Sequence, residues 1–289
     1  MPGSRHDIRD FLHHRPDAVL VEVTGADGST PREEGAWMLV ATDRSFGTIG
    51  GGQLEFMAID HARKALGNHA DSGSMPAQMP AQMIVPLGPE IGQCCGGRVA
   101  LGFRRMSADE KAELIERVDN EISQRPHVYI FGAGHVGDAL ALLLSLTPLR
   151  VILVDTREEE LSASQISGIE TCLTAMPEKV VRDAPEGSAF IILTHDHALD
   201  FLIAAEALGR HDASYVGMIG SKTKRATFRN WLSRDIGKPE LFDNLICPVG
   251  GTAVNDKRPA VIAALAAAEI MTHALNHAAA RSMAVSTAR

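Results

Sequence analysis

The first part of the chain combines short alternating segments with helical ones. Alternation of apolar and polar residues predicts β-strands, and apolar residues three and four positions apart predict helices. The predicted strands are residues 18–24 and 36–42, the alternating positions Met83, Val85 and Leu87, and the alternating positions Val99, Leu101 and Phe103. The predicted helices are residues 4–15, 54–66 and 107–123, and turn-rich loops are predicted at 25–31 and 47–52. This mixture predicts an α+β domain.

After Pro126 the pattern changes to strand, glycine turn, helix and strand. The predicted strands are residues 127–131, 150–155, 189–194 and 214–218, and the predicted helices are residues 139–146 and 259–277. Alternating strands and helices favour right-handed crossovers and a parallel sheet. We therefore predict an α/β protein with three parts: an N-terminal α+β domain at residues 1–106, a connecting helix at 107–125, and a Rossmann-like domain at 126–289.

Composition narrows the classes of partner. The chain has 289 residues and a formal net charge of −8, so it is a poor candidate for nucleic-acid binding. We find no apolar run long enough to cross a bilayer and no signal peptide, which predicts no membrane association. The four cysteines lack disulfide-scaffold spacing, so a cytoplasmic protein with reduced thiols is expected.

A glycine fingerprint carries the first candidate site. Gly132, Gly134 and Gly137 have G-x-G-x-x-G spacing between an apolar strand and an apolar helix, with His135 inside the motif. The glycines allow a tight turn, close approach of a phosphate, and close packing of helix on strand. Asp155 ends the next strand, where an acidic residue can bind ribose hydroxyls. Two interpretations stay open: an NAD(P) site, or a Rossmann domain whose pocket has another use.

Two later strand ends add polar groups. Ser221 and Lys222 follow one apolar strand, and together they can cap a helix and hold a phosphate. The alternative is a solvated helix face. His195 and His197 follow another strand, where they are either metal ligands or ordinary polar loop residues.

The segment Gly92-Gln-Cys-Cys-Gly-Gly97 is the most unusual local sequence in the chain. Cys94 and Cys95 do not have zinc-site spacing, and no second pair of cysteines accompanies them. Thiolates suit soft metals and sulfur-rich ligands, and they exchange sulfur. The adjacent Gln93 and the flanking glycines favour a function for at least one of the two thiols over two small buried apolar side chains.

These motifs, in this order, resemble those of the XdhC/CoxI family over nearly the whole chain. In the first half they are Gly28-Ser-Thr-Pro-Arg32, Gly47-Thr-Ile-Gly-Gly-Gly52 with Leu54-Glu55, and Gly92–Gly97. In the second half they are Phe131–Gly137, Tyr215–Ser221 and Cys247-Pro-Val-Gly250. The resemblance implies a chaperone for molybdenum cofactor (molybdopterin), with Cys94 and Cys95 contacting its metal. It further implies protection and sulfuration of the cofactor with a cysteine desulfurase, and delivery to apo-xanthine dehydrogenase of purine catabolism.

Three hypotheses follow. The leading one is a cofactor-binding chaperone without turnover of its own. The second is an NAD(P)-dependent oxidoreductase, which depends on the glycine fingerprint and Asp155 but lacks a convincing acid/base constellation. The third is a scaffold that joins the desulfurase to the dehydrogenase. A homodimer is expected, although the sequence gives no interface.

Overall fold

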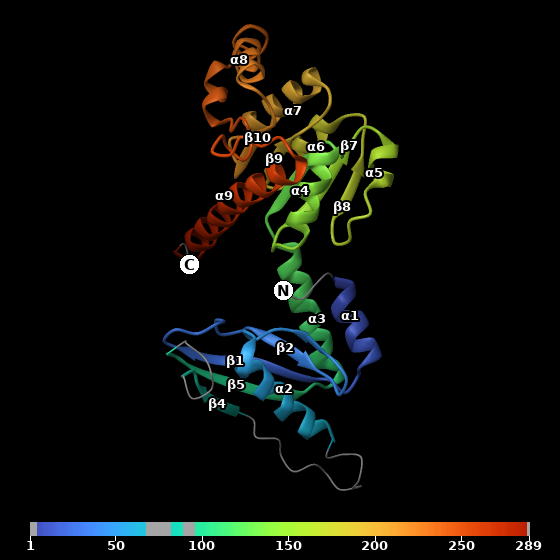
Figure 1. The fold of residues 1–289 in the computed structure, drawn as a ribbon, viewed down its shortest axis with the longest axis vertical. Coiled ribbons are helices and arrows are strands. Elements are labelled where there is room, and N and C mark those ends of the chain that lie inside the picture. The colour runs from blue at the N-terminus through green and yellow to red at the C-terminus, as the bar shows by residue number, and fades with distance from the viewer. Residues whose placement is uncertain (1–4, 68–81, 89–95, 288–289) are drawn as a thin grey trace. The chain divides into compact units, whose positions relative to one another are not determined.

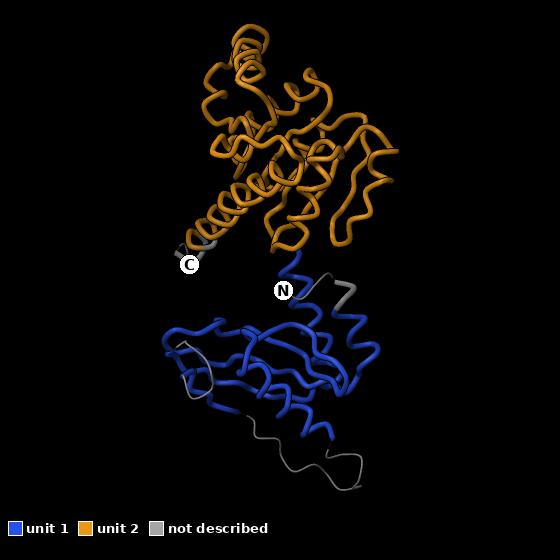
Figure 2. The backbone as a smooth tube through the Cα atoms, in the orientation of Figure 1, with its two compact units in different colours: residues 1–123 blue, residues 124–289 orange. Residues whose placement is uncertain are grey.

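The chain folds into two compact units, Met1–Ser123 and Gln124–Arg289 (Figure 2). A computed structural model describes residues 5–67, 82–88 and 96–287 (Figure 1). The first unit contains an antiparallel sheet and the second a parallel one, each of five strands. The predicted fold class is thereby confirmed, apart from the Cys-Cys loop, which lies outside the described residues.

The sheet of the first unit has the strand order β3-β2-β1-β5-β4. Its strands are β1 (Val19–Asp27), β2 (Trp37–Val40), β3 (Ser45–Gly47), β4 (Gln82–Pro86) and β5 (Arg98–Arg105). The helices of this unit are α1 (Arg5–His14), α2 (Gly52–Gly67) and α3 (Ala108–Ser123).

Helices cover both faces of this sheet. Val19, Val21 and Val23 of β1 point to the face where α2 buries Leu54 and Ala58. Leu20 points to the other face and shares a core with Phe11 of α1 and Leu114 and Val118 of α3. Successive strand residues point to opposite faces, so the alternating pattern in the sequence distributes β1 between two cores.

Several local predictions can be compared with the first unit. The predicted helix at 107–123 is confirmed as α3, and Ser107 and Glu110 form the reciprocal hydrogen bonds of a capping box at its start. The predicted loop at residues 25–31 is wrong in its first part, because β1 continues through a register shift after Val23 to Asp27. The short edge strand β3 was not predicted. Helix α3 packs against α1 and belongs to the first unit.

The sheet of the second unit has the strand order β10-β9-β6-β7-β8, and every neighbouring pair is parallel. Its strands are β6 (His127–Phe131), β7 (Arg150–Asp155), β8 (Glu170–Leu173), β9 (Ala189–Ile192) and β10 (Tyr215–Met218). Its helices are α4 (His135–Ser145), α5 (Glu158–Ala163), α6 (Pro177–Asp183), α7 (His197–Gly209), α8 (Lys222–Trp231) and α9 (Pro259–Thr287), with short η2 (Leu232–Ile236) and η3 (Pro239–Asn244) after α8.

Two apolar cores lie on opposite faces of this sheet. Leu140 of α4 and Ile270 of α9 belong to one core, together with Ile130 of β6. Phe201 of α7 and Phe228 of α8 belong to the other. Because both faces are covered, the strands are continuous apolar runs instead of alternating ones. Strand β8 was not predicted, because it lies at the exposed edge of the sheet and has no continuous run of apolar residues.

Helix α9 corrects one sequence prediction. Its segment Pro259–Arg281 is long and apolar enough, by length and composition, to cross a membrane. The prediction that no segment meets this criterion was therefore wrong. One side of the helix is buried in the core beside α4, through Ala263, Ala266, Ile270 and Ala274. Packing on the sheet thus accounts for part of its apolar surface.

Replacement of Leu140 by Ala tests the core between α4 and the sheet. Leu140 is completely buried, so Leu140→Ala should lower the free energy of unfolding by about 2–5 kcal/mol, measured by urea denaturation. Leu142 of the same helix is 54% exposed, and Leu142→Ala is the matched control, with an expected change of about 0.5 kcal/mol or less. Equal losses in both variants would contradict this assignment of the core.

Candidate functional site

The candidate site of the second unit lies at the carboxyl ends of β6 and β9. Strand β6 is the central strand; β7 and β8 lie on one side of it, while β9 and β10 lie on the other. The order of strands therefore reverses between β6 and β9. In open parallel sheets, ligands bind at the carboxyl ends of the strands at such a reversal point.

The glycine loop after β6 is packed directly against the loop after β9. Gly132 has a φ of +115°, and a Cβ atom there would lie 2.5 Å from the carbonyl oxygen of Leu193. A Cβ on Gly137 would overlap the carbonyl oxygen of Gly132. Both residues must be glycine for the turn to close and for α4 to pack on the sheet.

Gly134 has a different environment from Gly132 and Gly137, the other two glycines of the motif. It is the N-cap residue of α4, and a Cβ atom at this position would meet nothing within 4 Å. The helices after β9 and β10 are capped by side chains, since Asp196 accepts from Ala198 N–H and Ser221 from Lys224 N–H. Helix α4 has no side-chain cap. Its first-turn N–H groups therefore lie in the positive field of the helix end without a side-chain acceptor from the cap residue.

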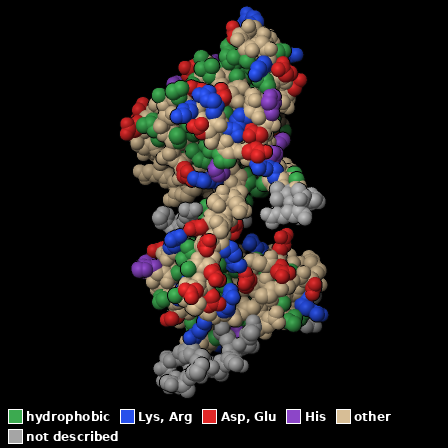
Figure 3. All heavy atoms as spheres, turned by 180° about the vertical axis from the view of Figure 1, so that it is seen from behind, with side chains coloured by type: hydrophobic (Ala, Val, Ile, Leu, Met, Phe, Trp, Pro, Cys, Tyr) green, Lys and Arg blue, Asp and Glu red, His purple; other side chains and the backbone are tan. Residues whose placement is uncertain are grey.

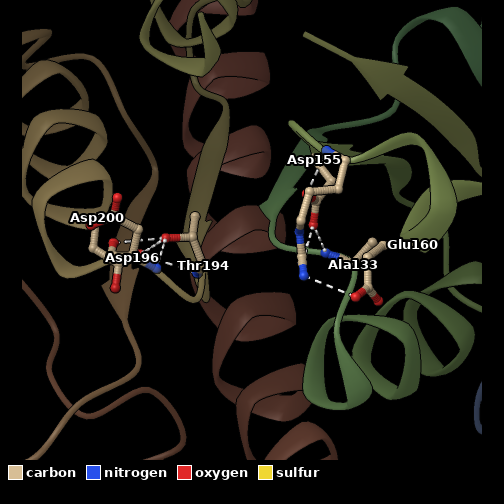
Figure 4. A network of polar contacts seen from close by, with 7 residues as sticks. Ala133, Asp155, Glu160, Thr194, Asp196 and Asp200 are labelled. Atoms are coloured by element: carbon tan, nitrogen blue, oxygen red, sulfur yellow. Dashed lines mark hydrogen bonds and ion pairs between the residues drawn. The ribbon is translucent and has the colours of Figure 1, made fainter. Parts of the chain in front are cut away.

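Asp155 connects the glycine loop to β7 (Figure 4). Its Oδ2 accepts the Ala133 N–H at 2.8 Å and an Arg157 N–H at 3.0 Å. Burial favours the neutral acid, but the hydrogen bonds from Arg157 and Ala133 outweigh it, and the pKa of Asp155 lies below its ordinary value. Asp155 is therefore a carboxylate that fixes the loop backbone.

A second polar network lies after β9, on the other side of the reversal point (Figure 4). Asp200 of α7 is completely buried. Its Oδ1 accepts the Thr194 N–H at 3.0 Å and the Thr194 hydroxyl at 2.6 Å. Its Oδ2 accepts from the ammonium group of Lys224, which also donates to the Ile219 carbonyl oxygen at 3.0 Å. This ion pair joins α7, α8 and the ends of β9 and β10.

Sequence reasoning missed Asp200 and Lys224 as the organising pair of this edge. Lys224 follows Lys222 at the start of α8, but unlike Lys222 it is buried, with 8% of its surface exposed. It lies four residues before the buried Phe228, which places it on the inward side of α8. The spacing of Lys224 and Phe228 could therefore have indicated from the sequence that Lys224 is buried. The position of Asp200 gave a similar indication, because its carboxylate lies on the most apolar side of α7.

The remaining predicted residues of the second unit are less enclosed. His135 is exposed at the first position of α4. Ser221 and Lys222 are both exposed at the start of α8, where Ser221 caps the helix as predicted. His195 and His197 are exposed beside the N-terminus of α7. Among the described residues, no group of three or more His, Cys, Asp or Glu side chains is arranged to hold a metal ion.

In the first unit, three motifs of the sequence meet at one end of the sheet. A Cβ on Gly97 would lie 2.5 Å from the Ser29 carbonyl oxygen, and one on Gly50 would lie 2.7 Å from Pro31. Glu55 Oε2 accepts from the Thr48 hydroxyl at 2.6 Å and from Gly51 N–H at 3.1 Å, which fixes the second glycine loop. Close contacts at Gly97 and Gly50 thus bring the three glycine segments together.

The Cys-Cys motif lies in the connection between β4 and β5 of this unit. Leu87 N–H donates to the Gly97 carbonyl oxygen at 2.8 Å, which closes the connection at its base. Gln93, Cys94 and Cys95 lie outside the described residues, so their predicted roles in cofactor and metal binding stay predictions.

Charges of both signs are spread over the surface. On the face drawn in Figure 3, Lys and Arg side chains are interspersed with Asp and Glu side chains over both units. The described residues on that face form no broad area of one sign. This agrees with the net charge of −8.

Two glycines of one loop provide a matched stability test. Gly137→Ala should destabilise the second unit by about 1–3 kcal/mol or more, because the new methyl group overlaps the backbone at Gly132. Gly134→Ala should change the free energy of unfolding by about 0.5 kcal/mol or less, because the space there is open. Thermal and urea unfolding of both variants would measure this. A more destabilising Gly134→Ala would show that the loop has another geometry.

The buried ion pair provides another test. Lys224→Met removes the cation and leaves the buried Asp200 without its counter-ion, which should lower the free energy of unfolding by about 3–5 kcal/mol. The double variant Asp200→Asn/Lys224→Met should recover part of this loss. Arg182→Met is the control, because it breaks an exposed ion pair with Glu206 and should change stability by about 1 kcal/mol or less. A similar effect of Lys224→Met and Arg182→Met would contradict the structural role of the pair.

Comparison with known proteins gives matches in both units. Residues 12–72 match the model of the XdhC and CoxI family, and residues 128–270 match that of the XdhC Rossmann domain. An uncharacterized protein of Escherichia coli, YqeB, is 26% identical over 88% of this chain, and the chain spans 43% of that protein's length. A probable xanthine dehydrogenase subunit of Bacillus subtilis is 23% identical, with 77% of this chain and 86% of that protein covered.

A crystal structure of a xanthine dehydrogenase from Bacillus halodurans has the same fold. It superposes with a TM-score of 0.74 at 18% identity, covering 93% of this chain and 95% of that one. One family model matches about half of the first compact unit and the other matches most of the second, in the order that the sequence motifs predicted. The chain therefore belongs to the XdhC and CoxI family, and its second unit is an XdhC Rossmann domain.

Proposed function

We propose that this protein is a molybdenum cofactor-binding chaperone in the maturation of xanthine dehydrogenase. The observation that carries the proposal is the presence, in one chain, of a unit of the XdhC and CoxI family and an XdhC Rossmann domain. The names of the Bacillus subtilis relative and of the Bacillus halodurans structure connect this family to xanthine dehydrogenase. In this proposal the protein protects the cofactor, supports its sulfuration with a cysteine desulfurase, and inserts it into apo-xanthine dehydrogenase.

The described residues fit the phosphate group of such a cofactor. Molybdenum cofactor is an anionic pterin phosphate with a dithiolene-bound metal. The uncapped N-terminus of α4, with open space over Gly134, is suited to a phosphate. His135, the first residue of that helix, is exposed beside the same loop and would contact the bound anion. When bound, the cofactor supplies the molybdenum centre that the recipient dehydrogenase requires.

Cys94 and Cys95 would contact the metal end of the cofactor in this proposal. Thiolates are soft ligands that suit molybdenum and its exchangeable sulfur better than carboxylates do. Gln93 precedes them and would provide an amide for the pterin. All three residues lie in the connection between β4 and β5, which the backbone of Gly97 anchors beside Ser29.

The same proposal assigns a cytoplasmic location, a homodimer, and no turnover by the protein itself. The alternative is an NAD(P)-dependent oxidoreductase, which the spacing of Gly132, Gly134 and Gly137 at the end of β6 favours. The two functions differ in what the purified protein should contain. A chaperone would carry a molybdenum pterin, whereas an oxidoreductase would bind NAD or NADP.

Co-purification tests the proposal. The wild-type chain, expressed in a host that makes molybdenum cofactor, should carry molybdenum and pterin in equal amounts. The double variant Cys94→Ala/Cys95→Ala should lose at least tenfold of both, because the soft ligands of the metal are removed. Metal analysis and fluorescence of the oxidised pterin measure the two contents.

Cys172→Ala is the control variant for this experiment. Cys172 is a half-buried free thiol on β8 of the second unit, so its loss should leave the cofactor content unchanged. Wild-type protein with neither molybdenum nor pterin would refute cofactor binding. Unchanged content in the Cys94/Cys95 double variant would refute the thiol role alone.

A further inference from the structure

The carboxylate of Asp155 has no acceptor site left for a ligand. Oδ2 accepts from Ala133 N–H and from Arg157 Nη2, and Oδ1 accepts from the backbone N–H and the Nε of Arg157. An ionised carboxylate offers about four lone-pair sites, and each of the four has a donor here. Its side chain is 4% exposed.

Arg157 is the residue that completes this arrangement. Its guanidinium group binds Asp155 through Nε and Nη2, at 3.1 and 3.0 Å, and Glu160 through Nη1 at 2.8 Å. The side chain is 29% exposed, whereas that of Asp155 is 4% exposed, so the guanidinium covers the buried carboxylate on its solvent side. Bidentate Arg–carboxylate pairs are among the strong hydrogen-bonded contacts of proteins. Here a second carboxylate, that of Glu160, also holds the Arg157 guanidinium in place.

A dinucleotide would need the Asp155 carboxylate oxygens, which already accept hydrogen bonds from Arg157. In Rossmann domains the acidic residue at the end of the second strand accepts hydrogen bonds from the adenosine ribose hydroxyls. Here a ribose diol would have to displace the guanidinium from Asp155. The displaced Arg157 would keep only Glu160 as a partner among the described residues, and the exchange would replace charge-assisted bonds by weaker ones.

We propose that Arg157 closes the ribose-diol position of the glycine-loop site and so selects against NAD, ADP-ribose and other ligands held by an adenosine diol. The phosphate position at the N-terminus of α4 stays open to phosphate esters that lack such a diol. This inference rests on the proposed function only in treating the glycine loop as a phosphate site. It makes Arg157 a specificity-determining residue.

Electrostatics support the same assignment. The pKa of Arg157 is raised above its ordinary value, chiefly by its hydrogen bonds to Asp155, and that of Asp155 is lowered. Both groups are therefore charged over the physiological range of pH, and the pair is not opened by protonation near neutrality.

A gain of binding tests the inference. ADP-ribose, NAD and NADP are titrated into the purified full-length chain by calorimetry. Wild-type protein should show no saturable binding of ADP-ribose or NAD at millimolar concentration. Arg157→Ala frees the Asp155 carboxylate and should bind ADP-ribose at least tenfold more tightly, and the double variant Asp155→Ala/Arg157→Ala should lose that gain. Arg182→Ala, which removes an exposed arginine of a surface ion pair, should behave as wild type.

Each contrary result has a definite meaning. Wild-type protein that binds NAD as tightly as Arg157→Ala would overturn the inference. Binding of NADP but not NAD by wild type would make Arg157 a receptor for the 2′-phosphate, which also overturns it. A folded Arg157→Ala variant that binds ADP-ribose no more tightly than wild type would also overturn the inference. If circular dichroism shows Arg157→Ala unfolded, Glu160→Gln, which loosens the guanidinium, should give a smaller gain, and no gain there overturns the inference.

Failure of the proposed function would be recognised separately. Molybdenum and pterin content are measured on wild-type protein and do not depend on the titrations with ADP-ribose. A protein without molybdenum whose Arg157→Ala variant gains ADP-ribose binding would refute the chaperone proposal and leave the role of Arg157 intact. A loaded protein without that gain would refute the role of Arg157 and leave the chaperone proposal intact.

Discussion

The close backbone approach between the β6–α4 turn and the end of β9 determines much of the second unit. Gly132 can adopt a φ of +115° against the Leu193 carbonyl because it has no Cβ, and Gly137 allows α4 to start directly over that turn. With the helix so placed, Leu140 and Leu144 enter the core on one face of the sheet. The same placement points the N-terminus of α4 toward the edge where parallel sheets bind ligands.

Polar networks on both sides of that turn fix its surroundings. Asp155 holds Ala133 from the β7 side, and Asp200 holds Thr194 from the β9 side with Lys224 as its counter-ion. Both carboxylates are buried, and each is compensated by a cation and by backbone N–H groups. Buried charges of this kind require partners, since an unpaired one would be strongly destabilising. The edge is thus largely preformed, with its open donors at α4.

The first unit supplies the other half of the proposed chemistry. Three glycine segments, spread over much of its sequence, pack together where β1 ends and β5 begins, and Glu55 organises one of them. This packing positions the base of the Cys-Cys connection on a rigid sheet. In the proposed function, the thiol pair of this connection would be a soft ligand for molybdenum.

The sequence by itself determined the fold class, the strands of the Rossmann core, the glycine turn and helix α3, because each depends on local periodicity or short spacing. The motifs also indicated the family. The sequence did not reveal that β1 continues to Asp27 or that β3 and β8 exist. Strand ends and edge strands depend on their pairing partners, which local patterns do not contain.

Only the tertiary structure decided which charged residues are buried together. Lys224 and Asp200 are 24 residues apart, and their pairing requires α7 and α8 to pack over neighbouring strands. The hydrogen bonds between Arg157 and Asp155 could not be predicted either, although the two residues are close in sequence, because local patterns do not show where the guanidinium is held; in the fold, both Asp155 and Glu160 hold it. Burial and hydrogen-bond saturation are properties of the packed chain, and they determine which predicted ligand residues are free to bind.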